Sequence, residues 1–405
     1  MTSERDLLSP RRAVDADWHD IIAVDARSFA LPAPLPDAEI AEFRSQVDQA
    51  YVVRDGDCLV AVSLYHALPL TVPGGAVLPT AGLSWVSVAA THRRRGLLRR
   101  MLQTQFADWR AAGLPLATLT ASEGGIYERF GFGPACFADS VTIDPGSVVW
   151  RSEAPADSRV RYGTPETIAE RVPALHDRWA ATRCGAIHRP ATWWPTILAD
   201  RGFRRNSQTS GLHYLLHDDG YAAYRLDARE MSATVEEFFA VTEQAHTDLW
   251  RVLTGLDLVT SIAATLPVDD PLGAKLRNAR AVRSTGRSDK LWVTLLDVAQ
   301  ALESRAYDVD ARVTLRVSDD WSDRAGDYLL DVTDGTGTVA RGAAPVDGEP
   351  LARVSVADLS SIYSGGVSAR TLAAAGRIVV DSAGTLDLLD ALFTTREAPF
   401  AGTFF

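Results

Sequence analysis

Apolar residues in the first 150 positions recur with two different periods. The period of a helix covers residues 18–29 and 36–46, and strand-like apolar runs cover residues 50–54 and 58–68. Asp55-Gly56-Asp57 separates the two runs and is typical of a hairpin turn. We therefore expect the chain to begin with a mixed α/β domain.

Residues 84–132 contain the most informative order of elements. An apolar strand (SWVSV) ends at Val88, the residues THRRRG follow, and a helix is expected over residues 97–109. A second strand (LATLT) and the segment IYERFGF complete the stretch. A helix start carries free N–H groups and a partial positive charge, Gly96 allows close approach, and three arginines precede it, so the order favours a pyrophosphate site. An arginine run by itself is more often a solvated surface or a site for another polyanion.

The second region repeats the order of strands followed by a helix. Residues 144–165 are rich in Pro, Ser, Gly and Asp, which predicts a linker and a domain boundary near residue 150. HYLLHDDGYAAYRL then predicts two strands around an Asp-Asp-Gly turn, and VEEFFAVTEQAHTDLWRVLTGL predicts an amphipathic helix ending at Gly255. Because no arginine-glycine loop follows these strands, we expect a degenerate copy without a cofactor.

The third region begins near Leu291. LWVTLLDVAQALESRAY predicts a helix, and the runs ARVTLRVSD, DYLLDVTD and LARVSVADL predict strands, so a helix on an antiparallel sheet is expected. A short amphipathic helix (TLDLLDALF) and the tail REAPFAGTFF follow. The last six residues have no charged side chain and include three phenylalanines, which predicts a docked tail with Phe404 and Phe405 inserted among apolar side chains.

Composition sets limits on the class of protein. The 405 residues are enough for two or three domains, and the hydrophobic fraction of 46% is ordinary for a globular chain. The sequence has neither an apolar run of about 18 residues nor a signal-peptide pattern, so we expect a cytoplasmic protein without a membrane partner. A net charge of −11 argues against a nucleic-acid partner and suits a cationic substrate. The three cysteines lie far apart, which predicts buried thiols and no metal site.

Two motifs carry a resemblance to a known family. Arg93-x-x-Gly96 resembles the pyrophosphate loop of GCN5-related N-acetyltransferases (GNATs), and IYERFGF resembles the segment that closes their cofactor site. One departure is Leu98, which stands where the family usually has a small residue. With the order of the three regions and the aromatic tail, the chain resembles the actinobacterial Eis (enhanced intracellular survival) acetyltransferases.

The resemblance implies a fold, a cofactor and an assembly. It implies α/β domains with mixed sheets: two tandem GNAT domains (a catalytic domain at 1–150 and a degenerate one at 151–290) and a sterol-carrier-protein-like α+β domain at 291–405. It also implies acetyl-CoA as co-substrate, a primary amine of an aminoglycoside or polyamine as acceptor, and a homohexamer built as a dimer of trimers. The alternatives are a protein or peptide lysine acetyltransferase and a non-catalytic CoA-binding regulatory protein.

Roles can also be assigned to individual residues. The resemblance assigns cofactor binding to the end of the first strand, the arginine loop and the end of the next strand: Val86, Ser87, Val88, Arg94, Arg95, Gly96, Leu97, Leu98, Arg99, Ser122 and Glu123. An amine site favours a carboxylate and an aromatic wall, so Asp25, Trp85 and again Glu123 are acceptor-side candidates. Trp193 and Trp194 are further candidates for the wall of this pocket.

Acetyl transfer to an amine needs a base for the amine and an acid for the leaving thiolate. The family's general acid corresponds to Tyr127, which could instead only pack against the pantetheine arm. The family's base is the C-terminal carboxylate, here that of Phe405, although the aromatic tail could instead only close a domain interface.

Overall fold

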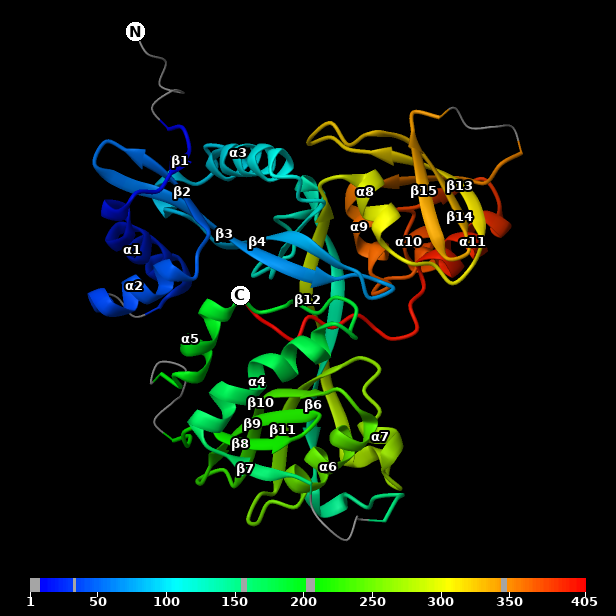
Figure 1. Cartoon of the computed structure of the whole chain (residues 1–405). Coiled ribbons are helices and arrows are strands. Elements are labelled where there is room, and N and C mark those ends of the chain that lie inside the picture. Colours follow the sequence, from blue (N-terminus) through cyan, green and yellow to red (C-terminus); the bar gives the residue numbers. More distant parts are fainter. Residues whose placement is uncertain (1–7, 32–33, 154–158, 202–207, 344–347) are drawn as a thin grey trace.

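A computed structural model describes residues 8–31, 34–153, 159–201, 208–343 and 348–405. Figure 1 shows three lobes, with the C-terminus near their junction. In the described residues the first two lobes share a 12-stranded sheet, ordered β1-β2-β3-β4-β5-β12-β6-β11-β10-β9-β8-β7. The third lobe has a separate five-stranded sheet, ordered β15-β14-β13-β16-β17. Part of the linker expected at residues 144–165, residues 154–158, lies outside the described residues.

The first lobe has the strands and helices that the apolar periods predict. Its elements are β1 (Arg11–Arg12), α1 (Trp18–Phe29), α2 (Asp37–Ser45), β2 (Gln49–Asp55), β3 (Cys58–Thr71), β4 (Val77–Val88), α3 (Leu97–Ala111) and β5 (Leu116–Leu119). Helix α3 buries residues spaced one helical turn apart, including Leu97, Met101 and Trp109. This packing fixes the start of α3 beside the end of β4.

Strands β6 (Gly133–Ile143) and β12 (Val282–Leu295) join the two lobes. β12 lies between β5 and β6, pairing with β5 through Trp292–Leu295 and with β6 along most of its length. Strand β6 in turn pairs with β11 of the second lobe. β12 therefore runs across residue 290, where the sequence suggested a boundary, and the first two lobes share one continuous sheet.

The second lobe corrects one helix prediction. Its elements are β7 (Arg161–Gly163), α4 (Pro165–Ala180), α5 (Trp194–Leu198), β8 (His213–His217), β9 (Gly220–Asp227), β10 (Ser232–Ala240), α6 (Glu243–Thr254), β11 (Ser261–Pro267) and α7 (Leu272–Lys275). The hairpin around Asp218 and Asp219 is confirmed. The helix expected from Val235 was wrong in its first part, because Val235 lies in β10 and the Thr242 side chain caps the helix only there.

The third lobe corrects two further expectations. Its elements are α8 (Val298–Ser304), β13 (Ala311–Ser318), β14 (Gly326–Thr333), β15 (Thr336–Arg341), β16 (Leu351–Ser355), α9 (Val356–Tyr363), α10 (Ala369–Ala374), β17 (Val379–Val380) and α11 (Ala383–Phe393). The helix expected from Leu291 begins only at α8, where Asp297 caps it, since residues 291–295 complete β12. The sheet is mixed rather than antiparallel, because β13 and β16 are parallel.

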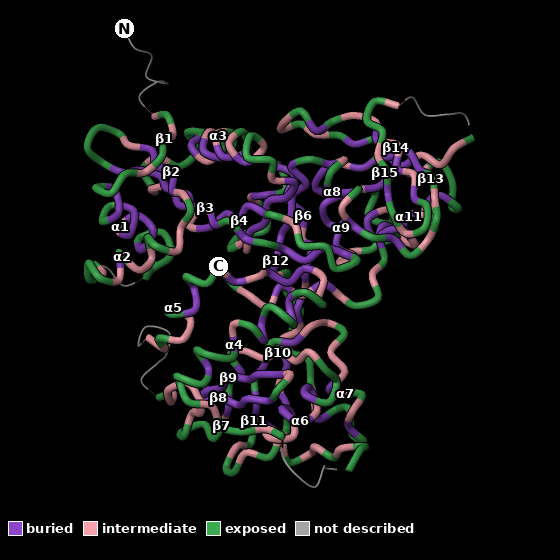
Figure 2. The backbone as a smooth tube through the Cα atoms, viewed as in Figure 1, coloured by how far each residue is buried: buried purple, intermediate pink, exposed green. Residues whose placement is uncertain are grey.

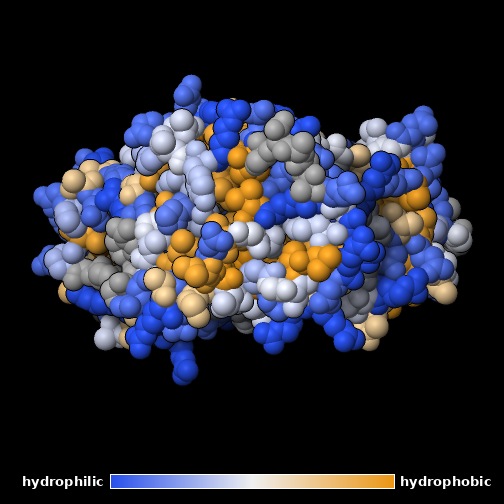
Figure 3. All heavy atoms as spheres, turned by 90° about the horizontal axis from the view of Figure 1, so that it is seen from below, coloured by the Kyte–Doolittle hydropathy of each residue, from blue (hydrophilic) through white to orange (hydrophobic). Residues whose placement is uncertain are grey.

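The buried residues lie mainly in and next to the strands. Figure 2 shows buried backbone in the middle of each lobe and where β6 and β12 cross between lobes. Seen from the end of the second lobe, hydrophobic residues gather in patches near the middle of the face and hydrophilic ones dominate its rim (Figure 3). In the described residues, no helix combines the length and the apolar character that a membrane span requires. Of the three thiols, Cys58 is exposed, contrary to expectation, whereas Cys136 is buried.

Candidate active site

Strands β4 and β5 separate at the point where the sequence predicted a cofactor. Their parallel ladder runs from Thr80 paired with Leu116 to Leu83 paired with Leu119, and β4 then continues to Val88 paired with β3 only. A β-bulge in β4 opposite Ser63 accompanies the separation, and Trp85 has a φ of +48° there. Beyond Leu83, the β5 side of β4 has no strand partner in the described residues, so its backbone groups can bind an extended ligand as an added strand would.

The arginine loop lies at the end of this opening. Arg94 and Gly96 have positive φ values of +65° and +77°, and Gly96 directly precedes α3. A side-chain carbon at Gly96 would meet no atom within 4 Å, so the space in front of its backbone is open. Arg93, Arg94 and Arg95 are exposed, and none has an ion pair among the described residues. The loop thus combines free positive charge with a helix start, as a pyrophosphate requires.

Side chains after β5 complete the opening. The Thr120 hydroxyl is buried without a hydrogen-bond partner in the described residues, directly after the end of β5. Ser122 and Glu123 follow on an exposed turn. An unpaired buried hydroxyl, a widened strand pair and an open arginine loop fit an acetyl-CoA-sized ligand, which would supply an activated acetyl thioester. Leu97 is buried in the start of α3, Leu98 is half-buried, and Arg99 lies over the Trp321 ring.

Tyr127 lies on the α3 face of this sheet. It immediately precedes a short 3₁₀ turn (Glu128–Phe130), and its ring packs against Phe132. It belongs to the same apolar cluster as Ala81 and Leu83 of β4. Burial, followed by the nearby Glu123 carboxylate, raises the pKa of Tyr127 to about 12. The phenol therefore stays protonated at neutral pH and is available as a donor.

Asp25 lies beside β4. The Ser87 hydroxyl of β4 donates a hydrogen bond of 3.1 Å to the Asp25 carboxylate on α1, and both side chains are buried. Burial raises the pKa of Asp25 to about 6. A carboxyl group with this pKa is mostly ionised at pH 7 and can accept a proton, so Asp25 is a second candidate base.

A pocket of about 660 Å³ lies between the first two lobes and the C-terminal tail. Ser84 and Trp85 of β4 line it from the first lobe, and Trp193 and β10 line it from the second. Trp193 thus lines the pocket, as expected for an aromatic wall. Trp194 is not part of the lining, and the Arg189 guanidinium lies over its ring. Neither Tyr127 nor Asp25 is part of its lining.

The C-terminal tail enters this pocket. The Phe405 ring lies near the rings of His66 and Trp193, and a side-chain carbon at Gly82 would lie 3.1 Å from it. The expected insertion of Phe404 was wrong, because its side chain is 82% exposed. Gly82 lies between Ala81 and Leu83, and neighbouring strand residues point to opposite faces. Phe405 and Tyr127 therefore approach β4 from opposite faces.

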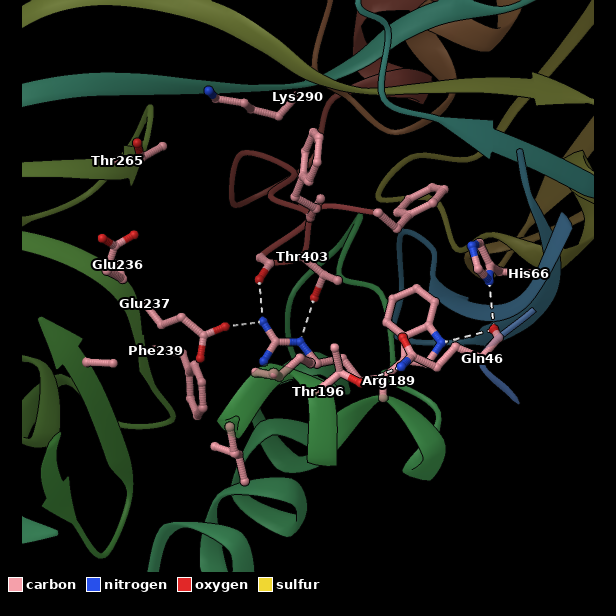
Figure 4. Close-up of a pocket in the computed structure, with 18 of the residues that line it drawn as sticks. Gln46, His66, Arg189, Thr196, Glu236, Glu237, Phe239, Thr265, Lys290 and Thr403 are labelled. Atoms are coloured by element: carbon pink, nitrogen blue, oxygen red, sulfur yellow. Dashed lines mark hydrogen bonds and ion pairs between the residues drawn. The ribbon is translucent and has the colours of Figure 1, made fainter. Parts of the chain in front are cut away.

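Sequence reasoning missed the polar lining of the pocket (Figure 4). The His66 ring nitrogen Nδ1 lies 2.8 Å from the Gln46 carbonyl oxygen, and burial lowers the pKa of His66, so its Nε2 is a neutral acceptor. The remaining polar lining includes Arg189, Asp200, Arg225, Glu236, Glu237, Thr265 and Lys290. These residues come from elements far apart in sequence, and no local motif marks them. The cationic side chains of this lining (Arg189, Arg225 and Lys290) equal its acidic side chains (Asp200, Glu236 and Glu237) in number, and Arg225 pairs with both Asp200 and Glu236.

The described residues contain no group of three or more His, Cys, Asp or Glu side chains placed to hold one metal ion. The groups at the site that can take part in acid–base chemistry or bind an anion are a buried phenol, two carboxylates, a neutral imidazole and an arginine loop.

Comparisons with known proteins agree with this geometry. Models of an acetyltransferase (GNAT) domain match residues 9–135 and 185–294, and a sterol carrier protein domain matches residues 298–402. The N-acetyltransferase Eis of Mycobacterium tuberculosis is 38% identical over 94% of this chain and 95% of its own. The chain belongs to the Eis family of N-acetyltransferases.

Two further similar proteins show the same full-length correspondence. An uncharacterized N-acetyltransferase of Streptomyces coelicolor is 33% identical over 97% of this chain and 98% of its own. The crystal structure of Eis1 from Mycobacterium abscessus is 30% identical, covers 98% of this chain and 100% of its own, and superposes with a TM-score of 0.85. The expected fold class, two GNAT domains followed by a sterol-carrier-like domain, is confirmed, as is the expectation of an N-acetyltransferase.

Proposed function

We propose that the chain transfers the acetyl group of acetyl-CoA to a primary amine of a cationic small molecule of the aminoglycoside or polyamine type. The observation that carries this proposal is that β4 borders two spaces at once. Its end forms the opening with the free arginine loop, and Ser84 and Trp85 line the large pocket between the lobes. A thioester in the opening and an amine in the pocket would meet at this strand.

In this proposal each of the three domains has a separate role. Residues 1–150, whose sheet β12 completes, are the catalytic domain that binds acetyl-CoA, and residues 151–290 contain a degenerate copy that contributes one wall of the acceptor pocket. Residues 291–405 supply the tail. The positions of Glu236 and Glu237 on β10 and of Phe405 at the pocket support this division.

Each catalytic group has a role that its surroundings favour. The terminal carboxylate of Phe405 accepts the proton of the acceptor amine, directly or through water, while the amine attacks the acetyl carbon. Tyr127 donates its proton to the sulfur as the carbon–sulfur bond breaks. Their placement on opposite faces of β4 supports this division, because each group then has a different partner: the carboxylate acts on the amine in the pocket, and the phenol acts on the sulfur in the opening after the amine has added to the carbonyl. Asp25 and His66 are the competing bases.

The acceptor side carries carboxylates and aromatic rings. Glu236 is 42% exposed, and the rings of Trp85 and Phe405 line the same pocket. Carboxylates and aromatic faces both attract ammonium groups. Lys290 and the paired arginines keep the pocket from being strongly acidic, so acceptors with hydroxyl groups as well as amines fit it better than bare polycations.

A thiol-release assay with an amine panel tests the function. The panel contains an aminoglycoside, a linear polyamine and a lysine peptide, and mass spectrometry identifies each acetylated product. We expect CoA release above background with the first two. Activity with the peptide alone would favour a protein acetyltransferase, and release with none of them would favour a CoA-binding regulatory protein.

Extending the tail tests the base. One glycine added after Phe405 moves the carboxylate by about 3.5 Å, so we expect turnover to fall at least about a hundredfold while the protein stays folded. Full activity of the extended chain would transfer the role to Asp25 or His66. We also propose a homohexamer, which mass measurement in solution tests.

A further inference from the structure

Arg189 connects the second lobe to the C-terminal tail. Its Nε donates to the Thr403 hydroxyl at 3.0 Å and its Nη2 to the Gly402 carbonyl at 3.0 Å. Nη2 also forms an ion pair with Glu237 of β10 at 2.5 Å. Figure 4 shows Glu237 and Thr403 reaching the guanidinium from different elements. These are the last side-chain hydrogen bonds in the described tail before Phe404 and Phe405.

The segment that carries Arg189 lies between the tail and the first lobe. The Phe400 N–H donates to the Cys184 carbonyl at 2.9 Å, and the Ile187 N–H donates to the Ala401 carbonyl at 3.2 Å. On its other side the segment bonds to β3, where the His188 N–H donates to the Pro69 carbonyl at 2.9 Å. Backbone hydrogen bonds thus hold the tail as far as Ala401, and the Arg189 side chain holds Gly402 and Thr403.

A contribution to folding stability does not by itself account for the buried Arg189 side chain. The Arg189 side chain is 3% exposed and stacks on Trp194, but its Nη1 has no hydrogen-bond partner in the described residues. A buried ion pair with an unpaired donor is a weak source of folding free energy. A planar fork that binds a carbonyl, a hydroxyl and a carboxylate at once is well suited to fixing a geometry.

We propose that Arg189 is a positioning residue that orients the last residues of the chain, so that the Phe405 carboxylate meets the acceptor amine in the pocket. This inference rests on the proposed function. Arg189 does not itself need to touch the substrate, since it acts through Gly402 and Thr403. Glu237 orients the guanidinium from the opposite side.

Arg189→Lys keeps the charge but loses the fork, and Arg178→Lys is the matched control, because Arg178 forms an exposed ion pair with Asp219 in the same lobe. We expect Arg189→Lys to lower kcat at least about tenfold without changing the Kd for acetyl-CoA. Carboxypeptidase should release Phe405 from this variant at least about tenfold faster than from the wild type. Arg178→Lys should change neither quantity. Glu237→Gln is the second variant if Arg189→Lys does not fold.

A double-mutant cycle separates positioning from a general structural effect. In the chain extended by one glycine after Phe405, Arg189→Lys should cause little further loss, because the carboxylate is already displaced. Additive losses in this cycle would overturn the inference. It would also be overturned if both Arg189→Lys and Glu237→Gln kept the wild-type kcat and the wild-type protection of Phe405. If the wild type acetylates no amine, the proposed function fails, and the carboxypeptidase rate still shows whether Arg189 holds the tail.

Discussion

Replacing Gly402 by alanine should displace the tail while leaving the cofactor site intact. Gly402 has a φ of +63°, and an added methyl group would lie 2.1 Å from Cη2 of Trp179. The Trp179 ring cannot move away easily, because it is buried and packs against His176 and Phe239. The change therefore imposes both backbone strain and a steric overlap at the tail.

The magnitude follows from these two terms. A left-handed backbone costs a non-glycine residue about 1–2 kcal/mol, and overpacking a buried site costs about 1–3 kcal/mol. Hydrogen bonds to a charged group contribute about 1.5–3 kcal/mol each, so the two bonds to Arg189 are of similar size to the strain. A loss of about 2 kcal/mol in holding the tail lowers the docking equilibrium constant by about 30-fold, and we expect kcat to fall by up to that factor.

Steady-state CoA release and carboxypeptidase digestion provide the assay. Gly376→Ala is the control, because Gly376 has a similar φ of +72° in the third lobe but no atom within 4 Å of an added methyl group. It carries the backbone cost without the overlap, so kcat should stay within about twofold of the wild type. If Gly402→Ala retained wild-type kcat and a protected tail, the reasoning from the Trp179 contact would be refuted.

Three further predictions concern the other groups at the site. Arg94→Ala and Arg95→Ala should each weaken acetyl-CoA binding by calorimetry, by about three- to thirtyfold for one or two lost charged contacts; undiminished affinity of both would place the phosphates elsewhere. Tyr127→Phe should lower kcat by about a hundredfold or more with little change in the Kd for acetyl-CoA, and unchanged turnover would leave it a packing residue. The folded chain binds a proton at Asp25 between pH 3.8 and about 6 that the unfolded chain does not, so stability falls as pH rises through this range. Asp25→Asn should accordingly raise the free energy of unfolding by up to about 3 kcal/mol at pH 8 and by much less at pH 4 in denaturant titrations, and an equal effect at both pH values would contradict the buried charge.

A feature formed by one continuous segment of the chain could be predicted from the local sequence pattern. The arginines before Gly96 and the apolar period of α3 follow one another in sequence, so the loop and its helix could be predicted together. Period alone failed at Val235 and Leu291, because an apolar strand that ends shortly before a helix resembles a longer helix. Thr242 and Asp297 decide both cases, since their side chains cap the helices where they start.

The pocket could not be predicted in the same way. His66, Arg189 and Glu237 lie on β3, on a loop and on β10, and only the shared sheet and the returning tail bring them together. The insertion of β12 between β5 and β6 is equally non-local, because a strand from residues 282–295 completes a sheet begun more than 150 residues earlier. The partial burial of Phe405 depends on contacts with Gly82 and Trp193, which the composition of the tail does not reveal, and the same composition does not distinguish it from the exposed Phe404.

A crystal structure of the chain with bound CoA tests the central claim most directly. The account predicts the diphosphate against the backbone of residues 94–99 and the pantetheine along Val86–Val88. The sulfur should lie within hydrogen-bond reach of the Tyr127 hydroxyl, with the Phe405 carboxylate on the opposite face of β4. A diphosphate bound away from Arg94 and Gly96, or a sulfur out of reach of Tyr127, would contradict it.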